Sequence, residues 1–125
     1  MPEAREFSIL LVEDDVSLRI LFRDTLADAG YSVIEASGGN EAYALFQSRK
    51  VDAIISDLRM PDGDGAELLK KVRSSARSGT LFYLVTGYSG LGDDVLSSSG
   101  ADGVFKKPFD VEAFLGMLEF SLTAA

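Results

Sequence analysis

Short apolar runs alternate along the chain with stretches in which apolar residues recur every three or four positions. The runs are rich in Ile, Leu, Val and Phe and are predicted to be strands at 7–12, 31–36, 51–56, 80–85 and 103–106. The first, third and fourth runs are almost continuously apolar, which is typical of strands buried on both faces. The regular alternation of strands and helices predicts a three-layer α/β sandwich with a parallel sheet.

The segments between the runs carry helical spacing. Residues spaced i, i+3, i+4 predict the buried stripe of the first helix, namely Leu18, Leu21, Phe22, Leu26 and Ala29. Asp15 and Ser37 occupy positions typical of N-caps, and Gly30 and Gly79 occupy positions typical of helix C-termini. The weakest element is the segment 89–100, because its glycines and consecutive serines disfavour a helix. A loop is the alternative there.

Composition limits the chemistry that this chain can perform. It contains no cysteine and no histidine, and its 20 acidic and 12 basic residues give a net charge of −8. Disulfides, thiolate chemistry and the usual zinc ligands are therefore excluded, and non-specific binding to nucleic acid is disfavoured. The sequence shows neither an apolar run of membrane-spanning length nor a secretory signal pattern. We therefore expect a cytoplasmic protein that does not contact a membrane.

Polar residues follow the predicted strands at their carboxyl ends. Glu13 and Asp14 follow the first strand, and Asp57, Thr86 and Lys107 follow the third, fourth and fifth strands. The carboxyl ends of parallel strands share one edge, where α/β sheets bind ligands. A single acidic pair after a strand is more often a solvated turn, so the interpretation depends on the convergence of several loops.

Three carboxylates at one edge repel one another unless a cation joins them. Because the available ligands are all oxygen atoms, the sequence favours Mg²⁺, with Mn²⁺ or Ca²⁺ as substitutes, over zinc. An Asp carboxylate beside such an ion is a suitable nucleophile toward a phosphoryl group. Lys107 and the hydroxyl of Thr86 would then bind the transferred oxygens.

Motifs in the chain resemble those of the receiver domain of two-component response regulators. They are ILLVEDD, IISDLRMPDGDG, LVTGY and KKPF, in the family's order and at its separations. The resemblance covers the whole chain and implies a single receiver domain over residues 1–125 with a flavodoxin-like (βα)5 fold and strand order 2-1-3-4-5. It also implies a phosphorylation-activated switch whose only catalysis is its own phosphorylation and dephosphorylation. The implied phosphoryl donor is a histidine kinase or a histidine phosphotransfer protein.

The resemblance also assigns roles at the acidic end of the sheet. Asp57 is similar to the family's phospho-acceptor. Glu13 and Asp14 are similar to its acidic pair, with Asp14 implied to bind Mg²⁺ directly and Glu13 to bind it through water. The backbone carbonyl of Arg59 is implied to be the third protein ligand of the metal.

Further roles concern the switch itself. Thr86 resembles the hydroxyl that moves toward the phosphoryl group, and Lys107 resembles the lysine that pairs with that group. The Lys107–Pro108 bond is implied to be cis, which an X-Pro bond permits at modest cost. Gly87 is implied to keep the approach to Asp57 open.

The sequence departs from the family pattern before the lysine. Receivers usually carry Tyr or Phe three positions earlier, where this chain has Val104, and the aromatic Phe105 occupies the neighbouring inward-facing position. The hypothesis that follows is that Tyr88 serves as the mobile aromatic. Together with Arg59 it would line the entrance to Asp57 and set the lifetime of the phosphoryl group. The alternative is that Tyr88 and Arg59 are ordinary exposed side chains.

The last predicted helix has a second apolar stripe. Its core stripe consists of Val111, Phe114, Leu115, Leu118 and Leu122. Met117 and Phe120 fall on the opposite face, which should be polar in a helix that packs on one side of a sheet. With the fourth helix and fifth strand they form a candidate surface for a downstream protein or for homodimerisation. Scattered surface apolar residues are the alternative.

Other functions fit the sequence less well. An FMN carrier on the same fold would need a Ser, Thr or Gly phosphate loop after the first strand, where this chain has Glu-Asp-Asp. A calcium loop at 62–65 fails because the alternate-ligand pattern breaks off. A phosphorylation-independent scaffold would not need the intact acidic pair, Asp57, Thr86 and Lys107. The chain is expected to be a stand-alone regulator or a receiver excised from a longer protein.

Overall fold

A parallel five-stranded sheet forms the centre of the fold. The structure, a computed structural model, describes residues 7–87, 100–107 and 110–123. The strands are β1 (Ser8–Val12), β2 (Ser32–Ala36), β3 (Ala53–Asp57), β4 (Leu81–Thr86) and β5 (Gly103–Lys106). Their order is β2-β1-β3-β4-β5, so the predicted α/β class and strand order are confirmed.

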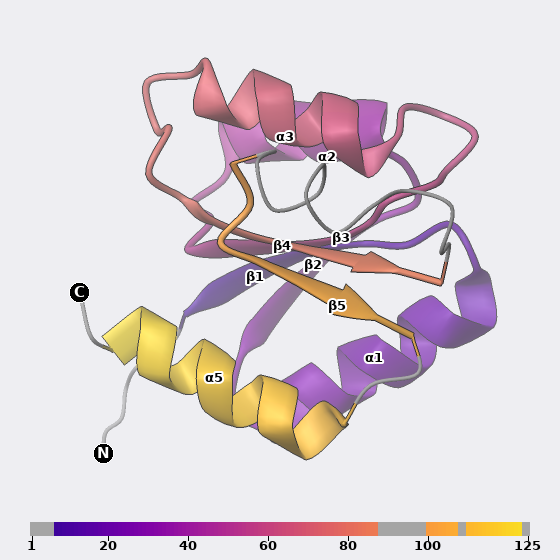
Figure 1. The fold of residues 1–125 in the computed structure, drawn as a ribbon, viewed down its shortest axis with the longest axis vertical. Helices are drawn as coiled ribbons and strands as arrows, with labels where there is room; N and C mark the ends of the chain where they lie inside the picture. The colour runs from indigo at the N-terminus through magenta and orange to yellow at the C-terminus, as the bar shows by residue number, and fades with distance from the viewer. Residues whose placement is uncertain (1–6, 88–99, 108–109, 124–125) are drawn as a thin grey trace.

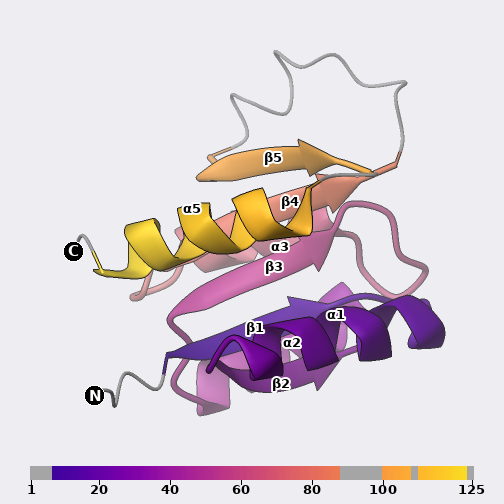
Figure 2. The same cartoon turned by 90° about the horizontal axis from the view of Figure 1, so that it is seen from below.

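Helices cover both faces of the sheet. They are α1 (Val16–Asp28), α2 (Gly39–Ser48), α3 (Gly65–Arg73) and α5 (Val111–Thr123). Helices α2 and α3 lie on one face, and α1 and α5 lie on the other (Figures 1 and 2). The weak helix that the sequence predicts at 89–100 falls almost wholly outside the described residues. Among the helices that the structure describes, none is long and apolar enough to cross a membrane.

The sheet separates two hydrophobic clusters. The cluster beneath α2 and α3 includes Leu10, Val12, Phe46, Ile54, Leu68, Val72, Phe82 and Leu84. The cluster beneath α1 and α5 includes Ile9, Leu11, Leu26, Ile55, Tyr83, Val85, Phe114 and Leu118. Alternate residues of β1, β3 and β4 therefore enter opposite clusters, which explains why these strands are almost continuously apolar.

Two of the predicted helix ends lie where the sequence places them. The Asp15 carboxylate accepts a hydrogen bond from the Leu18 N–H at 3.1 Å and is the N-cap of α1. Gly30 follows that helix with φ of 101°, in the left-handed region that favours glycine. The prediction for Gly79 is wrong, because α3 ends earlier at Arg73. Residues 74–80 form a loop, and its Ser78 and Thr80 carbonyls accept hydrogen bonds from the Arg73 side chain.

The prediction that Ser37 is the N-cap of α2 is also wrong. Its hydroxyl hydrogen-bonds to the Glu41 carboxylate at 3.0 Å. The first N–H groups of α2 bind the loop after β3 instead: the Gly39 N–H donates to the Gly63 carbonyl at 2.8 Å, and the next N–H donates to the Asp62 carbonyl at 3.1 Å. A Cβ atom at Gly39 would lie 2.6 Å from the Gly63 oxygen, so only glycine fits there. Helix α2 therefore fixes the loop that follows β3.

The first half of α1 is more exposed than its apolar periodicity predicts. Leu18 and Leu21 are 45% and 65% exposed, whereas Leu26 is fully buried. The helix begins directly after the loop that follows β1, and its first turns project beyond the ends of the strands (Figure 1). Leu18 and Leu21 consequently line a groove of about 530 Å³, whose walls also include Val111 of α5.

Arg73 connects the end of α3 to the start of β5 through hydrogen bonds. Its guanidinium donates to the carbonyls of Ser78 at 2.6 Å, Thr80 at 2.7 Å and Gly100 at 3.0 Å, and to the Asp102 carboxylate at 2.9 Å. These bonds join segments on both sides of residues 88–99. They therefore fix the position of the edge strand relative to the adjacent helix.

We expect Arg73→Ala to lower the free energy of unfolding by about 2–3 kcal/mol, because several acceptors lose a charge-assisted hydrogen bond. Urea denaturation followed by circular dichroism measures this change. Lys70→Ala is the matched control, since it removes an exposed cation from the same helix and should change stability by less than about 0.5 kcal/mol. Equal effects of the two substitutions would contradict the role assigned to Arg73.

Candidate functional site

The residues predicted to form the site meet at the carboxyl edge of the sheet. Glu13 directly follows β1, Asp57 and Thr86 are the last residues of β3 and β4, and Lys107 directly follows β5. Strand β1 lies between β2 and β3, and the connections from β1 and β3 run to helices on opposite faces (Figure 1). This reversal leaves a crevice outside the strand ends, which is the usual ligand site of such sheets.

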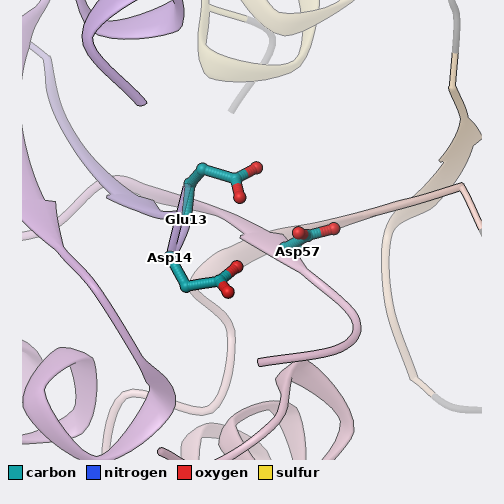
Figure 3. A group of neighbouring side chains, drawn as sticks. All are labelled: Glu13, Asp14 and Asp57. Atoms are coloured by element: carbon teal, nitrogen blue, oxygen red, sulfur yellow. The ribbon is translucent and has the colours of Figure 1, made fainter. Parts of the chain in front are cut away.

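Three carboxylates converge in this crevice. One oxygen from each of Glu13, Asp14 and Asp57 lies within 4.8 Å of the others. Figure 3 shows the three side chains, with those of Glu13 and Asp14 extending toward Asp57. Glu13 is buried, Asp57 is half-buried and Asp14 is exposed, so the cluster has a solvent-facing side. This donor set fits Mg²⁺, which typically binds one or two carboxylates and keeps several water ligands.

Lys107 lies beside two of these carboxylates. Its Nζ atom is 3.2 Å from Glu13 Oε1 and 3.5 Å from Asp57 Oδ1. Its backbone N–H donates to the Thr86 carbonyl at 2.8 Å, which continues the pairing of β4 with β5 by one residue. Burial by itself lowers the pKa of Lys107, but the charges of Asp57 and Glu13 outweigh burial and raise that pKa above its ordinary value. Lys107 is therefore a fixed cation at this site.

The Asp57 carboxyl is strained electrostatically. Burial, and then repulsion by Glu13, raises the pKa of Asp57 from 3.8 to about 6, although Lys107 acts in the opposite direction. Only 14% of the side chain is exposed. Burial is the larger cause, but one lysine also cannot balance three carboxylates, and a divalent cation would relieve the remaining repulsion.

The loop after Asp57 is held by its neighbours. The Leu58 N–H donates to the Val85 carbonyl at 3.0 Å, and the Gly65 N–H donates to the Leu58 carbonyl at 2.8 Å. A Cβ atom at Gly65 would overlap the Asp57 carbonyl oxygen, so glycine is required where α3 begins. The sequence analysis did not single out Gly65, although its place in DGDG directly after the N-cap Asp64 is a usable signal.

Thr86 and Gly87 lie at the end of β4. Thr86 is buried, with 2% of its surface exposed. A Cβ atom at Gly87 would have no heavy atom of the described residues within 4 Å, so these residues do not themselves demand glycine there. The roles predicted for Thr86 in the switch and for Gly87 at the entrance remain predictions.

The two β5 residues that depart from the family pattern face opposite sides of the sheet. Val104 packs against the cluster beneath α2 and α3, and Phe105 packs against the cluster beneath α5. The ring of Phe105 meets that of Phe114 edge to face, with 4.9 Å between the centroids. A Cβ atom at Gly103 would lie 3.1 Å from the rings of both Phe105 and Tyr83, so this glycine makes room for the aromatic pair.

The remaining predicted residues divide into described and undescribed positions. Arg59 is exposed in the loop after β3, and the role of its carbonyl remains a prediction. Tyr88 and Pro108 lie outside the described residues. On α5, Phe120 is 73% exposed, whereas Met117 is half-buried and packs against the core. Phe120 is thus the residue that α5 presents most openly on the predicted second stripe.

Arg19 is a residue that the sequence analysis missed. Its guanidinium donates to the backbone carbonyl of Glu13 at 2.8 Å and to the Glu35 carboxylate at 3.1 Å. In the sequence, the feature that could have indicated its role is an arginine near the start of the helix that follows the acidic pair. Its partner Glu35 belongs to another strand, which the local pattern does not reveal.

Comparison with known proteins identifies the class of protein that this fold and site define. Residues 9–119 match the response regulator receiver domain, and the chain belongs to this family. It is 37% identical over 112 residues to the transcriptional regulatory protein TrcR of Mycobacterium tuberculosis, covering 88% of this chain and 43% of TrcR. The chain spans between 24% and 55% of the first curated relatives that it matches. A receiver domain is a switch of two-component signalling rather than a classical enzyme.

Solved structures of receivers share the fold. A CheY-like receiver domain protein from Methanospirillum hungatei superposes with a TM-score of 0.85 at 30% identity, covering 94% of each chain. The response regulator TrrA from Thermotoga maritima, in complex with Mg²⁺ and BeF, gives a TM-score of 0.83 at 30% identity, covering 93% of this chain and 98% of TrrA. A receiver of the same fold is therefore known with magnesium and beryllofluoride bound.

We expect Asp57→Asn to stabilise the metal-free fold at pH 7.5 by about 1–2 kcal/mol, after allowance for solvent screening. In the wild type, the folded pKa of about 6 lies above the ordinary value of 3.8. The folded state therefore holds the Asp57 proton more tightly than the unfolded state does. This stabilises the fold fully below about pH 4, and the stabilisation is lost as the pH rises through 6. The advantage of the Asn variant should shrink accordingly between pH 7.5 and pH 4.5.

Urea unfolding at the two pH values in the presence of a chelator measures this difference. Asp62→Asn, which removes a carboxylate at an exposed position in the adjoining loop, is the control. If the effect of Asp57→Asn on stability did not depend on pH, that would contradict a raised pKa of Asp57 in the folded state.

Proposed function

We propose that this receiver is a phosphorylation-activated switch whose phospho-acceptor is Asp57. The observation that carries the proposal is the position of the Asp57 carboxylate, which is part of a three-carboxylate cluster and lies 3.5 Å from Lys107. The phosphoryl donor would be a phosphohistidine on a histidine kinase or a histidine phosphotransfer protein, in keeping with the family. The residues of the site would supply both the nucleophile and the charges that hold the transferred group.

In the proposed reaction, a carboxylate oxygen of Asp57 attacks the phosphorus of the phosphohistidine. An O–P bond forms and the N–P bond breaks, and the imidazole nitrogen keeps the electron pair and takes up a proton. Lys107 remains protonated and binds one transferred oxygen, and the hydroxyl of Thr86 donates to another. Hydrolysis of the acyl phosphate by water returns the Asp57 carboxylate and inorganic phosphate.

Mg²⁺ is the proposed cofactor. Glu13, Asp14, Asp57 and the backbone carbonyl of Arg59 would hold it, and Mn²⁺ or Ca²⁺ could take the same oxygen ligands. When bound, the ion supplies positive charge that offsets the negative charge of the carboxylates and the incoming phosphoryl oxygens. The geometry supports this assignment, because three carboxylates meet there and Lys107 contacts only Glu13 and Asp57 among them in the salt bridges of the described residues.

Phosphorylation would then shift the receiver between two populations. The phosphoryl group draws Thr86 and Lys107 toward Asp57, and both adjoin the paired ends of β4 and β5. The output surface would consist of β5, α5 and the segment 89–100, where the sequence predicts a weak fourth helix and which lies almost wholly outside the described residues. Phe120 is its exposed apolar residue on α5.

Acetyl phosphate or beryllofluoride, added with Mg²⁺, should shift the amide resonances near Thr86 and Val104 in a ¹H–¹⁵N spectrum. Asp57→Asn should abolish the shifts because the nucleophile is lost, whereas Asp62→Asn should retain them. A response without a divalent cation, or one that survives in Asp57→Asn, would refute the proposed phospho-acceptor.

Phe120→Glu should weaken self-association of the beryllofluoride-activated receiver by tenfold or more, since it would place an unpaired charge in an apolar interface; tenfold corresponds to about 1.4 kcal/mol. Sedimentation velocity measures the association. Ile20→Glu is the matched control, because it adds the same charge at an exposed apolar position on α1. Unchanged association in Phe120→Glu, or a wild type that stays monomeric when activated, would count against homodimerisation through α5.

A further inference from the structure

Arg19 joins the acidic pair to the edge of the sheet. Its Nη1 donates to the backbone carbonyl of Glu13 at 2.8 Å, and its Nε donates to Glu35 Oε1 at 3.1 Å. The side chain is only 18% exposed, so these bonds are largely shielded from water. One arginine therefore connects the loop that carries two predicted metal ligands to strand β2.

The orientation of Arg19 is itself held in place. Glu35 lies on β2 opposite Leu11 of β1, and its other oxygen accepts a hydrogen bond from Arg23 at 3.2 Å. The backbone N–H of Arg19 donates to the Asp15 carbonyl at 2.9 Å in the first turn of α1. Two charge-assisted hydrogen bonds to a planar guanidinium, on a residue whose backbone is helical, restrict the orientation of the side chain.

The bond to the Glu13 carbonyl fixes the peptide that joins Glu13 to Asp14. Because a peptide unit is planar, holding the carbonyl also sets the direction in which the chain enters Asp14. The N–H of Glu13 donates to the Ala36 carbonyl at 3.0 Å, and its carboxylate contacts Lys107. Asp14 is the exposed member of the cluster, and the placement of its carboxylate depends on this peptide.

We propose that Arg19 is a positioning residue for the divalent-cation site: it holds the Glu13–Asp14 peptide so that both carboxylates face Asp57 before the cation arrives. The inference rests on the proposed function, which assigns Mg²⁺ to this cluster. Preorganised ligands lose less conformational freedom on binding, so the support raises cation affinity. The charge of Arg19 acts in the opposite direction, because a nearby cation repels Mg²⁺. Removing Arg19 should therefore weaken cation binding if the residue acts by positioning, and strengthen it if the residue acts mainly through its charge.

The test is the Mn²⁺ dissociation constant, measured on the full chain by electron paramagnetic resonance. Arg19→Gln should raise it by about 3- to 10-fold, in line with the loss of a supporting hydrogen bond. Arg23→Gln is the matched control: it removes the other arginine bound to Glu35 but no contact with the Glu13 carbonyl, so its constant should stay within about twofold of wild type. With acetyl phosphate, the half-saturating Mg²⁺ concentration of Arg19→Gln should rise in proportion while the maximal rate stays close to wild type.

Equal dissociation constants for Arg19→Gln and Arg23→Gln, or tighter Mn²⁺ binding by Arg19→Gln, would overturn the inference. A purely structural role would lower the melting temperature without changing cation affinity. If Arg19→Gln fails to fold, Glu35→Gln offers the same comparison, because it removes the anchor of Arg19 and keeps the cation. Failure of the proposed function would look different: the wild type would not bind Mn²⁺, or Asp57→Asn would leave its affinity unchanged.

Discussion

Repulsion among carboxylates is the constraint around which this receiver is built. Glu13, Asp14 and Asp57 place oxygens within 4.8 Å of one another in a chain whose net charge is −8, and Lys107 contacts only two of them in the salt bridges of the described residues. Such a cluster would separate if its backbone were free to move. It stays together because the two segments that carry it emerge from adjacent strands buried on both faces. The hydrophobic core thus sustains an electrostatically unfavourable site that a cation can relieve.

The backbone at this edge is fixed mainly by neighbouring elements. Helix α2 donates its first N–H groups to the carbonyls of the loop that follows Asp57, and β4 accepts a hydrogen bond from the start of the same loop. Arg19 binds the loop that follows β1 in a comparable way. Two glycines, Gly39 and Gly65, permit approaches that a Cβ atom would block. The geometry of the site therefore depends on contacts that two loops make with α1, α2 and β4 rather than on any one motif.

The sequence predicts much of this arrangement because much of it is local. Continuous apolar runs identify the buried strands, and polar residues at the strand ends must meet at one edge once the strands are parallel. The errors arise where tertiary contacts decide. Ser37 has the chemistry of an N-cap, but carbonyls from another loop take its place. Leu18 and Leu21 have the period of a buried stripe, but periodicity does not tell how far a helix extends beyond its sheet. Arg19 depends on a partner in a different strand.

In β5 the aromatic residue lies one position later than in most receivers, and this changes which helix it contacts. Because strand side chains alternate between faces, moving an aromatic from position 104 to position 105 transfers it to the opposite side of the sheet. Phe105 there meets Phe114 of α5 edge to face and lies beside Tyr83, and Gly103 leaves room for both rings. A displacement of β5 would therefore be transmitted directly to α5. Since Phe120 belongs to the same helix, this contact links the strand next to Lys107 to the exposed face of α5 through described residues alone.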